Sequence, residues 1–200
     1  MQEIILASSS PRRAELLRRV GLKFRVVPSD VEERAEDSLD ARSLALKLAS
    51  QKAEAVAARY PEAIVLAADT VVCCDGEILG KPADWQDAVR MLQLLSGRTH
   101  EVSTGVVLRR ESTGQERREV VTTRVTFRRL SQEEILGYLA TGEPFDKAGA
   151  YGIQGYGALL VEGIEGCYSN VVGLPLAKVG EMLREFGVDL LCRNLNTTSP

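Results

Sequence analysis

Two arginines and a run of serines near the N-terminus have the residue types and the spacing of an anion site. Arg12 and Arg13 fall in the predicted first turn of a helix that begins after Ser10, where the helix dipole disfavours cations. A bound phosphate reverses this preference, because the free N–H groups of a helix N-terminus bind anions. Ser8 and its neighbours add hydroxyl donors. The segment therefore predicts a phosphate site, and a solvated arginine pair on a polar helix face is the alternative.

A lysine and an aspartate each interrupt an otherwise apolar surface. Lys52 lies in the middle of the apolar face of the helix predicted from about Asp40 to Arg59, and lysines are rarely buried without a partner. Its ammonium could snorkel to the surface or pair with a buried anion. Asp69 lies in the apolar strand 63–74, where aspartate is depleted. Cations, a metal ion or an abstracted proton would each satisfy this carboxylate, and a hydrogen-bonded carboxylate at a strand end is the structural alternative.

Three further residues are weaker candidates. Gln154 lies in a glycine-dense segment, and its amide offers one donor and one acceptor side by side, which suits the edge of a nucleobase. A tight turn without further meaning explains the same glycines. Lys81 follows a predicted hairpin in the tripeptide GKP, and His100 is the single histidine, for which we expect a structural role.

Length and composition exclude several classes of protein. The chain has 200 residues, a formal net charge of −3 and 44% hydrophobic residues, which excludes intrinsic disorder. A dedicated nucleic-acid binder would show a basic excess. No apolar run approaches the roughly 20 residues that a membrane span requires, and the N-terminus does not resemble an export signal. We therefore expect a cytoplasmic protein with reduced cysteines, folded as one domain of two lobes over 1–191 with a frayed tail at 192–200.

The predicted elements alternate between strands and helices, which indicates a mixed α/β protein. Strands are expected at 3–7, 63–74, 77–80, 102–109, 119–127 and 158–166, with a hairpin turn at Asp75 and Gly76 between the second and third of them. Helices are expected at 11–20, 40–59, 84–95, 131–141 and 175–186, the fourth opened by a capping box of Ser131 and Glu134.

Taken together, these segments resemble the Maf family of nucleotide pyrophosphatases. The matching motifs are LASSSPRRAELL, the lysine of ASQKA, ADTVV, GKP, LSGRTHEVSTGV, DKAGAYGIQG and VVGLP, in the family's order from residue 6 to about 175. The resemblance implies an elongated mixed sheet with flanking helices and two lobes around a central cleft, like the inosine triphosphate pyrophosphatase superfamily. It also implies hydrolysis of a nucleoside triphosphate to the monophosphate and pyrophosphate. The motifs SPRR, ADT and GIQG are those of the branch that prefers dTTP and UTP.

The resemblance also implies roles for individual residues. Asp69 would be the base that activates water and a ligand of Mg²⁺ or Mn²⁺, with Glu33 in the acidic loop as a second ligand. The triphosphate would be held by Arg13, Lys52, Lys81 and Ser8, and the base would face Arg12, Thr70 and Gln154. The expected partner is a small nucleotide, without nucleic acid or membrane, and the expected assembly is a homodimer. A non-catalytic nucleotide-binding regulator of cell division and a pyrophosphatase for purine triphosphates are the alternatives.

Overall fold

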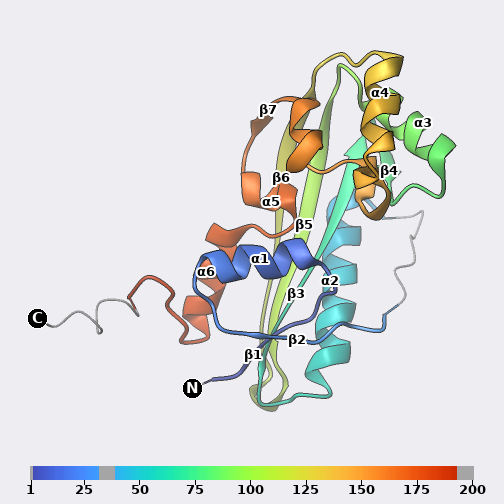
Figure 1. Ribbon diagram of the computed structural model, residues 1–200. Helices are drawn as coiled ribbons and strands as arrows, with labels where there is room; N and C mark the ends of the chain where they lie inside the picture. Colours follow the sequence, from blue (N-terminus) through green and yellow to red (C-terminus); the bar gives the residue numbers. More distant parts are fainter. Residues whose placement is uncertain (1, 32–38, 193–200) are drawn as a thin grey trace, which may run out of the picture.

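One seven-stranded mixed sheet, with helices on both of its faces, forms the centre of the molecule (Figure 1). The computed structural model describes residues 2–31 and 39–192. The expected α/β class, with a mixed sheet and flanking helices, is confirmed. Residues 32–38 of the predicted acidic loop (29–42), which include Glu33, and residues 193–200 of the predicted tail lie outside the described residues. No helix in the described ranges is long and apolar enough to cross a membrane.

The strands pair in the order β2-β1-β3-β5-β6-β7, and β4 pairs with the far end of β3. Their bounds are β1 Ile4–Leu6, β2 Arg25–Val26, β3 Ile64–Cys74, β4 Glu77–Leu79, β5 Thr99–Arg110, β6 Gln115–Phe127 and β7 Val161–Glu165. β1 runs parallel to β2 and β3, and the other pairs are antiparallel. β5 and β6 are longer than predicted, because cross-strand pairs such as Arg109 with Glu116 (2.9 Å) continue the pairing through polar ends.

Six α-helices flank the sheet in the described residues. Their bounds are α1 Pro11–Arg19, α2 Ala41–Ala57, α3 Trp85–Leu95, α4 Gln132–Ala140, α5 Tyr168–Val172 and α6 Leu176–Glu185. The side chains of Asp40, Asp84 and Ser131 cap their helices, and the predicted capping box is formed. Ser10 makes no side-chain cap, and its N–H instead donates to the Ser8 hydroxyl at 3.2 Å.

The two faces of the sheet are covered by different helices. Val65 and Ala67 of β3 pack with α2 on one face, whereas Leu66 and Ala68 pack with α1 and α6 on the other. Successive strand residues point to opposite faces, so neighbouring side chains of β3 enter separate layers. α2 lies directly on β5, because a Cβ atom at Gly105 would be 2.4 Å from a carbonyl oxygen of this helix.

A third group of buried side chains fills the end of the sheet near β4. It joins α3 and α4 to the ends of β3, β5 and β6, and Figure 1 shows both helices at that end of the molecule. His100 and Phe127 pack there, with ring centroids 5.1 Å apart. Short 3₁₀ helices (Glu143–Asp146, Ala148–Ala150 and Gly155–Leu159) return the chain from α4 to β7. This return segment contains Gln154.

The edge of β3 is open between its pairings with β1 and β4. β1 pairs with Ile64–Leu66 and β4 with Val72–Cys74. Over residues 68–71, β3 has no partner on that side within the described part of the chain. After β1 the chain turns away into the serine segment and α1. The opening therefore joins the two faces of the sheet at Asp69 and Thr70.

Candidate active site

A pocket of about 810 Å³ lies at this open edge of β3. Its lining includes every described residue for which the sequence predicted a role in binding or catalysis. These residues are Ser8, Arg12, Arg13, Lys52, Asp69, Thr70, Lys81 and Gln154. They come from four separate stretches of the fold: the β1–α1 turn with the first turn of α1, the helix α2, the stretch from β3 to the loop after β4, and the segment after α4. The structure thus brings together cationic side chains and one strand aspartate in a single hollow.

Lys52 and Asp69 form an ion pair on the α2 face of the sheet. The Lys52 ammonium donates to Oδ1 of Asp69, and the two residues are only 6% and 7% exposed. The alternative in which Lys52 pairs with a buried anion is therefore correct, and snorkelling to the surface is not observed. α2 holds the lysine over β3 through its small residues, Ala49 and Ala53, which are fully buried against the sheet.

Arg13 and Thr70 lie on the opposite face, where they belong to a second polar network. The Arg13 guanidinium donates to the Gly173 carbonyl at 2.8 Å, to Thr70 Oγ1 at 3.0 Å and to Ser8 Oγ at 3.2 Å. Thr70 Oγ1 also lies 2.9 Å from Thr104 Oγ1. Arg13 is 9% exposed, so this network fixes the wall of the pocket beneath the serine segment.

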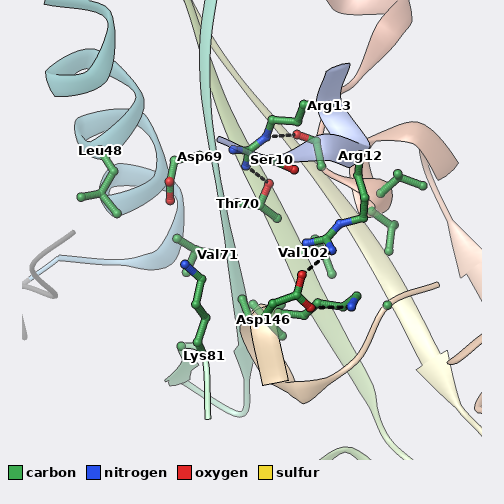
Figure 2. A pocket seen from close by; sticks show the side chains of 18 of the residues that line it. Ser10, Arg12, Arg13, Leu48, Asp69, Thr70, Val71, Lys81, Val102 and Asp146 are labelled. Carbon is green, nitrogen blue, oxygen red and sulfur yellow. Dashed lines mark hydrogen bonds and ion pairs between the residues drawn. The ribbon is translucent and has the colours of Figure 1, made fainter. Parts of the chain in front are cut away.

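Arg12 reaches across the pocket to Asp146, a residue that the sequence analysis missed (Figure 2). The Arg12 Nη1 atom lies 3.0 Å from Oδ2 of Asp146, and Lys147 Nζ lies 2.6 Å from Oδ1. Partial burial tends to raise the pKa of Asp146, but the hydrogen bonds from Lys147 and Arg12 outweigh it and hold the pKa below its usual value. Asp146 is the first residue of the glycine-dense motif DKAGAYGIQG, but an acid at that position breaks no local preference and so was not singled out.

Lys81 lies just after β4, and both Lys81 and Gln154 line the pocket. Figure 2 shows the Lys81 side chain extending toward Val71, on the side of the pocket where Asp69 lies. A hydrogen bond of 3.0 Å from the Gly149 N–H to the Gly80 carbonyl ties the lysine's loop to the segment that carries Gln154. Gln154 is half-buried and has extended backbone angles (φ −92°, ψ 165°).

His100 lies behind the pocket and has the structural role expected for it. Its Nε2 atom is 2.7 Å from the hydroxyl of Tyr151, whose side chain lines the pocket. The ring is 2% exposed, and burial lowers the pKa of His100 to about 4. The imidazole is therefore neutral at physiological pH. Burial also raises the pKa of Tyr151, which keeps its hydroxyl protonated.

The pocket offers few carboxylates to a metal ion. Asp69 and Asp146 are the acids among its described lining residues, and no group of three or more His, Cys, Asp or Glu side chains in those residues could hold a metal. Mg²⁺ typically keeps several waters and binds one or two carboxylates together with substrate phosphates. A single carboxylate, that of Asp69, is enough for this mode of Mg²⁺ binding. The second predicted ligand, Glu33, lies outside the described residues.

Comparison with known proteins places the chain in a family. Residues 3–186 match the family described as Maf-like protein. The dTTP/UTP pyrophosphatase of Moorella thermoacetica is 54% identical over 190 residues, covering 95% of this chain and 98% of the relative. That of Symbiobacterium thermophilum is 55% identical over 190 residues, covering 94% and 95%. A crystal structure of a dITP/XTP pyrophosphatase from Mycobacterium abscessus aligns with a TM-score of 0.45 at 16% identity, covering 93% of this chain and 97% of that one. By the length and identity of these matches, the chain belongs to the Maf-like protein family.

Proposed function

We propose that this protein hydrolyses nucleoside triphosphates, with dTTP and UTP as preferred substrates, to the nucleoside monophosphate and pyrophosphate. The observation that carries the proposal is the convergence of five cationic side chains and Asp69 on one pocket. Family relatives named dTTP/UTP pyrophosphatase support the choice of reaction and substrate.

The cations would neutralise and position the triphosphate. Lys52 and Lys81 lie on the side of the pocket that contains Asp69, whereas Arg13 and Ser8 form the wall at the start of α1. Phosphoryl chemistry of this kind depends mainly on positioning and charge neutralisation. A polyanion bound between these groups would present its α-phosphorus to the carboxylate of Asp69.

Asp69 would orient a water molecule and accept its proton during attack on the α-phosphorus. The carboxylate is held by β3 and by the Lys52 ammonium, so its direction is fixed before substrate arrives. Such preorganisation avoids reorganisation during the reaction. Pyrophosphate leaves from the opposite side of the phosphorus.

Asp69 would also ligate a divalent ion, Mg²⁺ or Mn²⁺, with Glu33 as a further ligand. The ion would offset negative charge on the phosphate oxygens and on the leaving pyrophosphate. The remaining ligands would be phosphate oxygens and water, as the small number of pocket carboxylates requires.

Gln154 would read the base, with Arg12 and Thr70 nearby. Its amide can accept from N3–H and donate to O4 of uracil or thymine. Cytosine presents the reverse pattern, so its binding would leave polar groups unpaired. We further propose that the protein is cytoplasmic and that it forms a homodimer. The family resemblance implies the homodimer, and light scattering on the purified protein tests this assembly.

A nucleotide panel with product identification tests the function. Purified protein is incubated with dTTP, UTP, CTP, dATP and GTP in the presence of Mg²⁺, and pyrophosphate and orthophosphate are measured separately. We expect pyrophosphate from dTTP and UTP, and loss of turnover on addition of EDTA with recovery on excess Mg²⁺. Orthophosphate release, binding without turnover, or a preference for purines would each overturn the proposal.

A further inference from the structure

The carboxylate of Glu143 holds one end of the loop that carries Gln154 directly, and it holds the other end through the hydroxyl of Tyr138. Its Oε2 atom accepts from the N–H of Tyr156 at 3.0 Å, and its Oε1 atom accepts from the N–H of Gly157 at 3.2 Å. Oε1 also accepts from the Tyr138 hydroxyl at 3.0 Å. The same hydroxyl accepts from the N–H of Gly152 at 3.2 Å. The chain from Gly152 to Gly157 is thus closed around a single pair of side chains.

The glycines of this loop fit the Glu143 carboxylate closely. A Cβ atom at Gly155, where φ is +63°, would lie 2.6 Å from Oε2 of Glu143. A Cβ atom at Gly157 would lie 1.9 Å from the Gly152 carbonyl oxygen and 2.9 Å from the Tyr138 hydroxyl. Two of the loop's glycines are therefore required by its tight path around the carboxylate, and not only by approach to a ligand.

Gln154 depends on this backbone for its position. Among the described residues, its side-chain amide makes no hydrogen bond that would fix its direction, although it lines the pocket. Its place is set by the backbone on either side, which is anchored two residues before it and two and three residues after it. Tyr138 is 5% exposed and belongs to the buried cluster of α3 and α4, so the anchor is connected to a rigid part of the fold.

We propose that Glu143, together with Tyr138, is a positioning residue that sets the base selectivity of the pocket through Gln154. The inference rests on the proposed function. Discrimination between uracil and cytosine requires that the amide present its acceptor and its donor at fixed places. A loop released from Glu143 would let the amide shift or rotate, so either pyrimidine edge could be paired. Contacts to the triphosphate would be unchanged, because they come from the other walls of the pocket.

The test compares selectivity in Glu143→Gln and in a matched control. In Glu143→Gln, an NH₂ group replaces one of the two carboxylate oxygens. This group cannot accept a hydrogen bond, so one of the loop N–H groups loses its acceptor. Glu133→Gln makes the same change at an exposed position of α4 outside the pocket. We expect the ratio of kcat/KM for UTP over CTP to fall by about tenfold in Glu143→Gln, because the loop loses hydrogen bonds to a charged acceptor, and to stay unchanged in Glu133→Gln. Inhibition by inorganic tripolyphosphate, which has no base, should match the wild type in both.

Two further variants separate positioning from general damage. Tyr138→Phe leaves the Glu143 carboxylate intact but removes the acceptor for Gly152, so its selectivity should fall as well. In a Gln154→Ala background, Glu143→Gln should change the UTP/CTP ratio no further, because residues that act through one group are not additive. An additional loss in the double variant, or a weaker inhibition by tripolyphosphate, would assign Glu143 a merely structural role.

The outcomes distinguish this inference from the proposed function. A wild-type protein that releases no pyrophosphate from any nucleotide refutes both. A wild-type protein that prefers UTP, together with folded Glu143→Gln and Tyr138→Phe variants that keep this preference, refutes only the positioning role. Loss of the preference in both variants, with tripolyphosphate inhibition kept, supports it.

Discussion

At the scale of single residues, the Lys52–Asp69 pair is the feature on which the pocket depends most. Both charges are almost completely removed from water. Burial of two ions costs several kcal/mol each, and their mutual attraction repays this only while the pair is intact. Each charge is therefore required to keep the other stable in its buried position.

Asp69→Asn should abolish turnover while nucleotide binding persists. The amide keeps the size of the carboxylate but cannot accept a proton from water. Pyrophosphate release from dTTP should fall below about a tenth of the wild-type rate, since general-base catalysis typically contributes more than this. Asp189→Asn, an isosteric change distant from the pocket, is the control. Residual turnover above that level would remove Asp69 from the role of base.

Lys52→Met should destabilise the protein, because it leaves the Asp69 carboxylate buried without its ammonium. The free energy of unfolding should fall by about 3 kcal/mol, as for other broken buried ion pairs. Urea denaturation measures the loss. The double variant Lys52→Met/Asp69→Asn should regain part of it, because its buried pair is uncharged. A double variant less stable than Lys52→Met would contradict this account of the pair.

The sequence identified these two residues because each breaks a local rule. A lysine in the middle of an apolar helix face and an aspartate inside a β-branched strand are conspicuous without a structure. The sequence did not predict that Lys52 and Asp69 pair with each other, because this contact depends on how α2 lies across β3. Glu143 and Asp146 were missed for the opposite reason. Acids in a polar, glycine-rich segment obey every local preference, and only the folded loop gives them partners.

At the scale of elements, the close contact between α2 and β5 places Lys52 over the strand that carries Asp69. Gly105→Ala tests this contact, because the added Cβ would meet the Ala45 carbonyl oxygen at 2.4 Å. Overpacking of this kind typically costs about 1–3 kcal/mol, and a helix displaced from the sheet should also lose turnover. Gly137→Ala, on the exposed side of α4 with no atom within 4 Å of the new Cβ, is the control and should be neutral or stabilising. A Gly105→Ala protein of wild-type stability would show that α2 does not need this close approach.

Elements with a clear periodicity were predicted well, whereas two short elements, β2 and α5, were not predicted. The predicted bounds of α2, α3 and β3 agree with the structure within two residues, because each combines a cap or a turn with a long apolar pattern. β2 has two residues and α5 has five, which is too few for either period to be recognised. Both depend on tertiary contacts: β2 pairs with β1, and Asn170 of α5 donates to the Val102 carbonyl at 3.0 Å.

At the scale of the whole molecule, burial of the neutral His100 links stability to pH. The pKa of His100 is about 4 in the folded protein and about 6.5 for an exposed histidine. Between these values the unfolded chain binds more protons than the folded protein. Stability is therefore complete above pH 6.5 and decreases as the pH falls through this range.

The free energy of unfolding should decrease by about 2 kcal/mol between pH 7.5 and pH 5.0 because of this residue. Urea denaturation at the two pH values measures the change. His100→Gln can still hydrogen-bond to Tyr151 but cannot gain a proton, so its decrease over the same range should be smaller by that amount. If the free energy of unfolding had the same pH dependence in both proteins, His100 would gain its proton as readily in the folded protein as in the unfolded chain.

Because β3 has an open stretch between β1 and β4, two neighbouring residues of this strand, Asp69 and Thr70, line the same pocket although their side chains lie on opposite faces of the sheet. The Asp69 side chain is held on the side where α2 packs, whereas Thr70 and Arg13 are held on the side where α1 packs. Under the proposed function, a change around Thr70 would alter substrate preference without disturbing the layer that holds Asp69. The length of β1 controls this arrangement. If β1 continued for a few more residues, its backbone would pair with β3 at Ala68 and Thr70 and close the pocket.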